Sequence, residues 1–426
     1  MMTVSYALKN GSRIVLVPMQ ETKAFTVQVL LPVGSRHESR VMNGGSHFLE
    51  HMMFKGTKRR PNTQIISRAL DAIGAEYNAF TGKDHTGYYI KAAAEHAELL
   101  LDMLSDMLYH SIFDPKEFER ERTVIIEEIH MYEDNPMMFV DELFEQELFR
   151  GNTLGWRISG AREDIEKMKL ADVATYRKKH YRPSGLVIAL AGKIPENARD
   201  LVSRYFDATK EPSITKPKPF ATFHAASMSK GPKAVHHYKE TEQVQCMLGF
   251  PGYGYGDKRL AAQSVLSVIL GGNMSSRLFT QVRERRGLAY MVRAGVSPYQ
   301  DIGAFAVQAG LRKDKVDEAL KIILSELKKT KDVVVGAAEL RRAKEYIKGK
   351  ITLGLEESNE VADFYGRQEL FQKKMESPEE KIAKIMAVTA KDVQTAARDI
   401  FRVERLRLAV IGPFEDAARF QKLLRV

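Results

Sequence analysis

The stretch DVATYRKKHYRPSGLVIALAG, residues 172–192, returns as DVQTAARDIFRVERLRLAVIG at residues 392–412. The two stretches are 220 residues apart, and an amphipathic stretch upstream recurs at nearly the same offset. The corresponding positions are Asp172 and Asp392, Leu186 and Leu406, Gly192 and Gly412, and the segments Ala97–Leu104 and Ala319–Glu326. A pattern that recurs at a fixed offset is the signature of an internal repeat. The sequence therefore predicts two homologous halves.

The length of 426 residues fits two domains, since domains typically contain about 100–200 residues. Hydrophobic residues make up 44% of the chain, which is enough for a separate core in each half. Between the halves lie Pro212, Pro217, Pro219 and Pro232. Proline at this density opposes helices and central strands. We expect a first domain at residues 1–206, a linker at 207–233, and a second domain at 234–426.

The local patterns predict hairpins mixed with helices. Asn10-Gly11 between two apolar runs is typical of a type I′ hairpin turn. Strands are expected at Tyr6–Leu8, Arg13–Val17, Ala24–Leu31, Leu186–Ala191 and Leu406–Ile411, and helices near Gly45–Lys55, Thr63–Ile73, Glu95–Tyr109 and Pro115–Glu133. This mixture predicts an α+β fold, in which each half is an antiparallel-rich sheet covered by helices on one face. A linker between two such halves suggests a clamshell.

Charge and cysteine content narrow the classes of function. The formal net charge is +10, but the basic residues are scattered, and we expect runs such as Lys58-Arg59-Arg60 to be solvated faces rather than a nucleic-acid site. Cys246 is the sole cysteine, so a reducing compartment is expected and any metal must be held by histidine and carboxylate groups. No apolar run reaches the ~18 residues of a membrane span, and Met1–Lys9 lacks a targeting pattern. We expect a bacterial cytoplasmic protein without a membrane partner, although a mature mitochondrial matrix protein would look the same.

The segment from Gly44 to Gly56, GGSHFLEHMMFKG, carries the chemistry. On a helix, His47, Glu50 and His51 share one face, and the other faces are apolar. Burying two imidazoles and a carboxylate without partners costs several kcal/mol, and a divalent metal would engage all three. Histidines at positions i and i+4 can both reach a zinc ion at about 2.0–2.1 Å. The alternative is a core helix whose histidines bond to carbonyl groups, and the carboxylate between them makes it the weaker interpretation.

A catalytic zinc site needs a third protein ligand and leaves one position to water. A second helix is predicted to begin at Asp114-Pro115, where an N-cap residue precedes an N1 proline. Glu121 and Glu128 share a face of this helix, and Glu127 is their neighbour. Spacing alone does not choose among these three glutamates.

The motif His-x-x-Glu-His is that of the inverted zincins. Over essentially its whole length the sequence resembles the pitrilysin and insulysin family, in particular its short branch with the mitochondrial processing peptidase β-subunit and bacterial processing-protease-like proteins. The resemblance implies that Glu128, 77 residues after His51, is the third ligand of one zinc ion per chain. It also implies a supporting role for Glu121, while Glu127 would face elsewhere.

Two further segments resemble functional segments of that family. Gly74–Thr81 resembles its edge strand, which implies that Asn78, Ala79 and Phe80 bind the substrate as an added strand. Arg283 and Tyr290 match a pair that reaches the scissile peptide from the second domain and could stabilise the oxyanion. The stretch Leu266–Leu270 shows that the second half has lost the metal motif.

The sequence thus predicts a metalloendopeptidase that cleaves unstructured peptides or presequence-like segments. Glu50 would take a proton from the zinc-bound water and deliver it to the leaving amine. Family members with both the zinc motif and the Arg/Tyr pair on one short chain tend to be homodimers, so a homodimer is expected. The alternative is a non-catalytic scaffold or core subunit of the same fold, which the intact His47, Glu50, His51 and Glu128 oppose.

Overall fold

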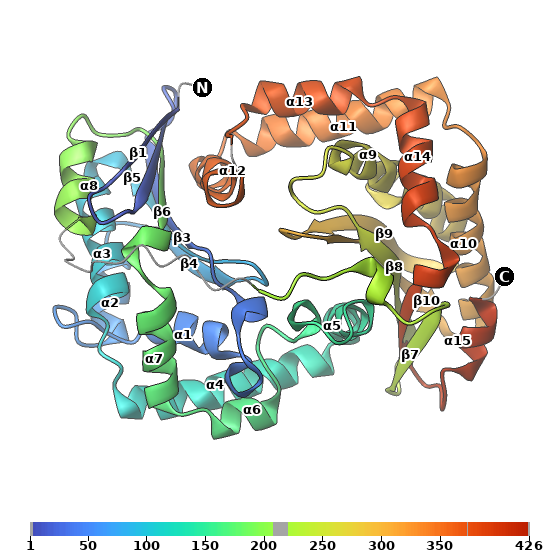
Figure 1. Ribbon diagram of the computed structural model, residues 1–426, viewed down its shortest axis with the longest axis horizontal. Helices are drawn as coiled ribbons and strands as arrows, with labels where there is room; N and C mark the ends of the chain where they lie inside the picture. The colour runs from blue at the N-terminus through green and yellow to red at the C-terminus, as the bar shows by residue number, and fades with distance from the viewer. Residues whose placement is uncertain (1–2, 208–219, 373, 425–426) are drawn as a thin grey trace. The chain divides into compact units, whose positions relative to one another are not determined.

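The computed structural model describes residues 3–207, 220–372 and 374–424 and divides into two compact units (Figure 1). Unit 1 comprises Met1–Ile129, Trp156–Phe220 and Thr352–Ser377, and unit 2 comprises His130–Gly155, Ala221–Ile351 and Pro378–Val426. The expected domain boundaries divided the chain into its first and second halves. The observed units do not follow these boundaries, because residues 130–155 of the first half belong to unit 2 and residues 352–377 of the second half belong to unit 1. Residues 208–219 of the expected linker lie outside the described residues.

Unit 1 is built on a six-stranded sheet with the order β1-β2-β6-β3-β5-β4. Only the pair β2 and β6 is parallel, so the sheet is rich in antiparallel pairs as expected. Its strands are β1 (Val4–Ala7), β2 (Arg13–Pro18), β3 (Ala24–Leu31), β4 (Glu76–Thr81), β5 (Thr86–Ala93) and β6 (Val187–Gly192). Its helices are α1 (Gly45–Met53), α2 (Thr63–Asp71), α3 (Ala97–His110), most of α4 (Pro115–Asp134), α6 (Arg162–Lys167), α7 (Leu170–His180), α8 (Ala198–Phe206) and α12 (Ser358–Phe371).

Both faces of this sheet are covered, whereas helices were expected on one face only. α1 and α3 pack in the larger core, and α12 covers the other face in a smaller cluster that contains Val15, Leu30 and Tyr365. Strand β6 is buried at every position, which requires an apolar layer on each side. The hydroxyl groups of Thr26 and Ser358, 2.8 Å apart, add a polar contact between β3 and α12. The covering helix comes from the far end of the sequence, so no local pattern indicated it.

Unit 2 repeats the plan with five strands in the order β7-β11-β8-β10-β9. Its elements are β7 (Lys233–Tyr238), β8 (Gln243–Gly252), β9 (Ala289–Pro298), β10 (Gly303–Arg312) and β11 (Arg407–Gly412), with α5 (Pro136–Leu148), α9 (Leu260–Gly271), α10 (Val316–Asp332), α11 (Ala337–Gly354), α13 (Pro378–Ala387), α14 (Ala390–Ile400) and α15 (Ala418–Leu423). The parallel pair β7 and β11 corresponds to β2 and β6. α5 covers one face, as α12 does in unit 1. The predicted α+β fold with two homologous halves is confirmed.

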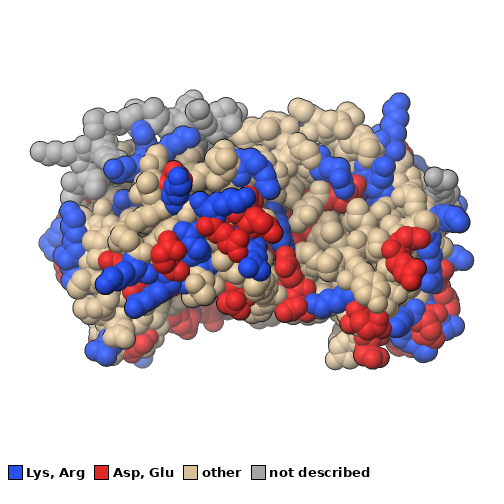
Figure 2. All heavy atoms as spheres, turned by 90° about the horizontal axis from the view of Figure 1, so that it is seen from below, with Lys and Arg blue, Asp and Glu red and all other residues tan. Residues whose placement is uncertain are grey.

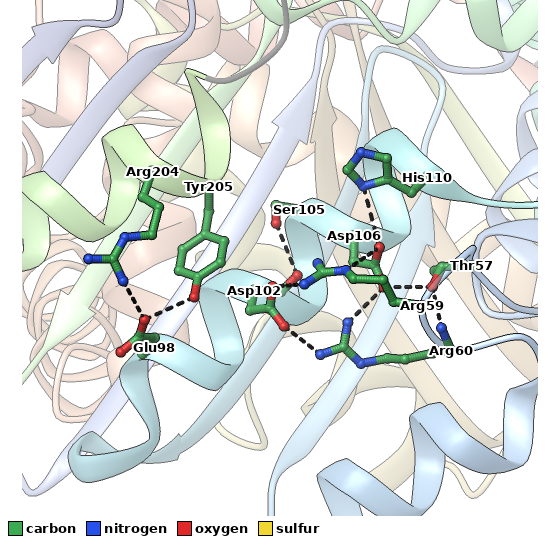
Figure 3. Close-up of polar contacts among 10 residues, drawn as sticks. All are labelled: Thr57, Arg59, Arg60, Glu98, Asp102, Ser105, Asp106, His110, Arg204 and Tyr205. Atoms are coloured by element: carbon green, nitrogen blue, oxygen red, sulfur yellow. Dashed lines mark hydrogen bonds and ion pairs between the residues drawn. The ribbon is translucent and has the colours of Figure 1, made fainter.

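The segment after α1 is held by an ion-pair network on α3 (Figure 3). The buried carboxylate of Asp106 accepts hydrogen bonds from Thr57 at 2.5 Å, Arg59 at 3.1 Å and Arg60 at 2.7 Å. Arg60 also pairs with Asp102 at 2.5 Å, and its side chain is only 14% exposed. The prediction that Lys58-Arg59-Arg60 forms a solvated face is therefore wrong for Arg60. The network fixes the chain just beyond the candidate metal helix.

Candidate metal centre

Helix α1 is fixed at its N-terminus by a buried carboxylate. Glu38 accepts hydrogen bonds from the backbone N–H groups of Gly44 at 2.8 Å and Ser46 at 2.7 Å. A negative group at this end of a helix satisfies unpaired donors and interacts favourably with the helix dipole. Burial raises the pKa of Glu38 to about 7. Gly44 has a φ of +91°, and a Cβ there would lie 2.5 Å from the carbonyl oxygen of Ser159, so this position requires glycine.

The structure brings together His47 and His51 of α1 with Glu128 of α4. One ligand atom from each residue can be chosen so that all three lie within 4.8 Å of one another. The Oε2 atom of Glu128 lies 3.5 Å from Nε2 of His47 and 3.4 Å from Nε2 of His51. Ligands placed about 2.0–2.1 Å from one tetrahedral zinc ion are about 3.4 Å apart. The donor set and its spacing therefore fit zinc.

The protonation of the two imidazoles follows from their surroundings. Burial and the neighbouring His51 lower the pKa of His47 to about 4, so His47 is neutral and can act as a ligand. Burial opposes a charge on His51 as well, but in the absence of a metal the hydrogen bonds to Glu121 and Glu128 outweigh it and raise the pKa of His51 to about 9. Zinc would have to displace this proton to bind His51, so metal binding there releases a proton. The two rings are 4.7 Å apart between centroids.

Glu121 orients His51 from the side away from the cluster. Its Oε2 atom lies 2.9 Å from Nδ1 of His51, and its Oε1 atom lies 2.6 Å from Nζ of Lys55. Burial acts in the opposite direction, but the hydrogen bonds from His51 and Lys55 lower the pKa of Glu121. A carboxylate on the outer nitrogen of a ligand histidine fixes the orientation of the ring. Glu127, the third glutamate that spacing left open, is exposed.

Glu50 lies on α1 between the two histidines in sequence and is not one of the three clustered ligands. Burial raises the pKa of its carboxyl group, and a hydrogen bond from Thr81 acts against this rise. The Thr81 hydroxyl donates to Oε2 of Glu50 at 2.5 Å. A raised pKa brings a carboxylate closer to the range that suits a general base near neutral pH.

The predicted substrate-binding residues Asn78, Ala79 and Phe80 lie on β4, which forms an edge of the unit 1 sheet. Asn78 is exposed and accepts a hydrogen bond from the backbone N–H of Ala79 at 2.9 Å. Phe80 packs with the cluster on the face that α12 covers, and its ring occupies the space that a side chain at Gly87 would need. The side chain of Phe80 is therefore engaged in packing within unit 1.

Arg283 and Tyr290 lie close together in unit 2. Arg283 belongs to the short π-helix Phe279–Glu284, and Tyr290 is the second residue of β9. The guanidinium carbon of Arg283 is 5.5 Å from the centroid of the Tyr290 ring. Tyr290 is 72% exposed and lines a cavity of about 260 Å³.

Three residues that contribute to the site were not predicted. Glu38, Lys55 and Thr81 each act on α1 or on a predicted site residue through a hydrogen bond or an ion pair. Thr81 is the last residue of the predicted edge strand Gly74–Thr81 and, by the two-residue period of a strand, shares a face with Ala79 rather than Phe80. That alternation was the one available signal. The contact of Lys55 with Glu121 depends on tertiary packing, and that of Glu38 depends on the path of the loop before α1.

Comparison with known proteins identifies the family. Residues 13–162 match the family described as "Insulinase (Peptidase family M16)", and residues 167–347 match "Peptidase M16 inactive domain". A protein of Bacillus subtilis named "Uncharacterized zinc protease YmxG" is 36% identical over 96% of this chain and 98% of its own length. The chain belongs to peptidase family M16. The predicted family is confirmed.

Further similar proteins agree with this assignment. A zinc protease of Streptomyces coelicolor, also named uncharacterized, is 36% identical over 96% of this chain and 89% of its own length. The crystal structure of a protease from Helicobacter pylori superposes with a TM-score of 0.91 at 25% identity, covering 97% of this chain and all of that one. A Pseudomonas fluorescens structure titled as a peptidase M16 inactive domain, at 20% identity and a TM-score of 0.87, shares the fold.

The chain is a zinc protease of the M16 family, and a His-His-Glu site that fits zinc is present in unit 1. The predicted cofactor and enzyme class are confirmed at that level. The relatives named above are bacterial. Among the described residues, no helix combines the length and the apolar character that crossing a membrane requires.

Proposed function

We propose that this M16 protease is an endopeptidase that cleaves unstructured peptides or presequence-like segments at the centre formed by His47, His51 and Glu128. The observation that carries the proposal is the position of Glu50, on the same helix face as both imidazoles and outside the ligand set. When bound there, zinc would polarise the scissile carbonyl and lower the pKa of a coordinated water.

Side chains of the protein would carry out the remaining steps, which are proton transfer and the orientation of the ligands. Glu50 accepts a proton from the attacking water and returns it to the leaving amine. Glu121, itself held by Lys55, keeps His51 oriented. The buried flanks of α1, which include Phe48 and Met52, fix the helix in the core of unit 1.

The rival function is a non-catalytic scaffold of the same fold, and one experiment separates the two. The zinc-loaded protein is incubated with an unstructured peptide, and the products are identified by mass spectrometry. An endopeptidase yields internal cuts that cease with a chelator and return with zinc. A scaffold binds the peptide and releases it intact.

We propose that the substrate binds as an extended strand along the edge of β4. The support is the place of β4 at the end of the sheet, where its outward backbone groups have no neighbouring strand within the described sheet. Methylation of single backbone nitrogens in a cleavable peptide tests this proposal. Methylation should raise KM sharply at every second residue of the bound segment, because only alternate N–H groups face the neighbouring strand. Equal effects at all positions would contradict strand pairing.

We propose that Arg283 and Tyr290 stabilise the developing oxyanion. The proposal is supported by the short distance between the two side chains and by the exposure of both residues in unit 2. Loss of one oxyanion donor typically lowers kcat by about 10²–10³-fold, and Arg283→Ala and Tyr290→Phe should therefore lower kcat with the zinc content unchanged. Arg285→Ala, a neighbouring exposed arginine, is the matched control and should behave as wild type. Equal rates in all three variants would remove the pair from the mechanism.

Homodimer formation, a cytoplasmic location and the absence of a nucleic-acid partner complete the proposal. On the face drawn in Figure 2, basic and acidic side chains are interspersed rather than gathered into one continuous basic surface. Cys246 is a buried free thiol, as suits a reducing compartment. The homodimer is tested by light scattering at working concentration, and the cytoplasmic location is tested by cell fractionation. A salt-dependent gel shift tests the absence of a nucleic-acid partner. An active monomer would contradict the dimer without affecting the peptidase.

A further inference from the structure

The carboxylate of Glu50 has a single hydrogen-bond partner among the described residues, the hydroxyl of Thr81. The 2.5 Å separation is typical of a hydroxyl that donates to an ionised carboxylate, which is the stronger class of hydrogen bond. The contact occupies Oε2, and Oε1 remains for proton transfer. A glutamate side chain has three freely rotating torsions, so without a contact to its carboxylate it would adopt several orientations. The hydrogen bond from Thr81 is the contact that restricts Glu50.

Thr81 is itself held rigidly. It is the last residue of β4 and pairs with Thr86 of β5. The turn after Thr81 is closed by a hydrogen bond from the Gly82 N–H to the His85 carbonyl at 2.8 Å. Asp84 in this turn forms a buried ion pair with Arg36 at 2.9 Å, which fixes the turn. Threonine is also β-branched, which restricts the rotation that places its hydroxyl.

Strand β4 thus has two roles, and different atoms perform them. Its backbone is proposed to pair with the substrate, and the Thr81 side chain lies on the face of the sheet that α1 covers. A side chain used for Glu50 does not contribute to substrate affinity. Loss of the hydroxyl should therefore affect the chemical step and spare binding.

We propose that Thr81 is a positioning residue for the general base, in that its hydroxyl fixes the Glu50 carboxylate in the orientation required for proton transfer. The inference rests on the proposed function, because it presupposes that Glu50 is the base. It adds a residue to the site without changing the metal ligands.

The test compares Thr81→Val, which keeps the shape of the side chain, with Thr81→Ser, which keeps the hydroxyl. A hydrogen bond to a charged group corresponds to about 10–100-fold in rate. Thr81→Val should lower kcat by that factor with KM and zinc content unchanged, and Thr81→Ser should recover most of the loss. Thr26→Val is the matched control, since it removes a buried hydroxyl from the opposite face of the same sheet and should leave kcat unchanged.

Crystal structures of the wild type and Thr81→Val provide a readout that does not depend on activity. The Glu50 carboxylate should have one orientation in the wild type and a different or divided one in the variant. An unchanged kcat in Thr81→Val, a Thr81→Ser as slow as Thr81→Val, or an unchanged Glu50 orientation would each overturn the proposal. A wild type that binds zinc and cleaves no peptide would instead overturn the proposed function, and the Glu50 orientation would still decide the role of Thr81.

Discussion

Helices α1 and α9 follow corresponding strands of the two units, yet only α1 carries metal ligands. α1 places His47, Glu50 and His51 on one face, whereas α9 has neither histidine nor carboxylate and buries Val265 and Leu266. The polar stripe of α1 is tolerated because α4 supplies Glu121 and Glu128 opposite it. The duplicated fold thus provides a place for a helix in each unit, and a partner helix with matching acids makes this place a metal site in unit 1.

The helix N-termini differ in the same way. Buried Glu38 caps α1 through two backbone N–H groups. At α9 the corresponding contact is partly exposed: the N–H of the N-cap residue Arg259 bonds to the carboxylate of Asp257, whose side chain is 27% exposed. The metal helix is thus anchored more firmly than its counterpart, which is what a site with fixed ligand positions requires.

The largest effect is expected from His51→Ala. This change removes a ligand and the contact that Glu121 supports, so zinc content should fall and peptide cleavage should drop to the level of the chelated protein. Zinc content is measured by mass spectrometry of the purified protein. Ser264→Ala on α9 is the matched change and should alter neither quantity. Full zinc occupancy in His51→Ala would place the metal elsewhere.

A smaller effect is expected from Glu121→Gln. The amide cannot accept as strong a hydrogen bond from His51 or pair with Lys55, and loss of such an outer contact typically weakens metal binding about 10–100-fold. Competition with a fluorescent zinc chelator measures the affinity. Glu127→Gln changes an exposed glutamate of the same helix and should keep wild-type affinity. The reverse ranking of these two variants would show that the wrong glutamate has been assigned to His51.

The smallest effect on zinc binding and cleavage is expected at the cap of α1, where the change is in how stability depends on pH. Burial raises the pKa of Glu38 from 4.5 to about 7, so the folded protein binds this proton more tightly than the unfolded chain. The free energy of unfolding should therefore fall as pH rises from 4.5 through 7, with a share of about 3 kcal/mol from Glu38. Urea unfolding of the chelated protein should show a shallower decline for Glu38→Gln than for wild type.

Asp257→Asn is the control for this pH effect at the start of α9. The hydrogen bond from Arg259 lowers the pKa of Asp257, so its contribution is lost only as pH falls below the ordinary value of 3.8. The pH profile of this variant should parallel that of wild type between pH 4.5 and 7. A Glu38→Gln profile with the wild-type slope would mean that Glu38 stays ionised in the fold.

The sequence predicted the parts of this molecule that depend on local periodicity. The repeat predicted two corresponding sheets, and the i, i+3, i+4 spacing placed His47, Glu50 and His51 on one face of a helix. It could not predict that α5 and α12 pack with the sheet of the other half, because that exchange has no local signal. Burial of Arg60 likewise depends on Asp102 and Asp106, which are remote in sequence.

The proposed mechanism depends most on Glu50, which is to serve as the base and not as a ligand. The direct measurement is the cleavage rate of an unstructured peptide by zinc-loaded Glu50→Gln relative to zinc-loaded wild type. The amide keeps the shape of the side chain and removes its basicity, so we predict equal zinc content and a rate about 10²–10⁴-fold lower. A Glu50→Gln protein that cleaves the peptide as fast as wild type would contradict the claim.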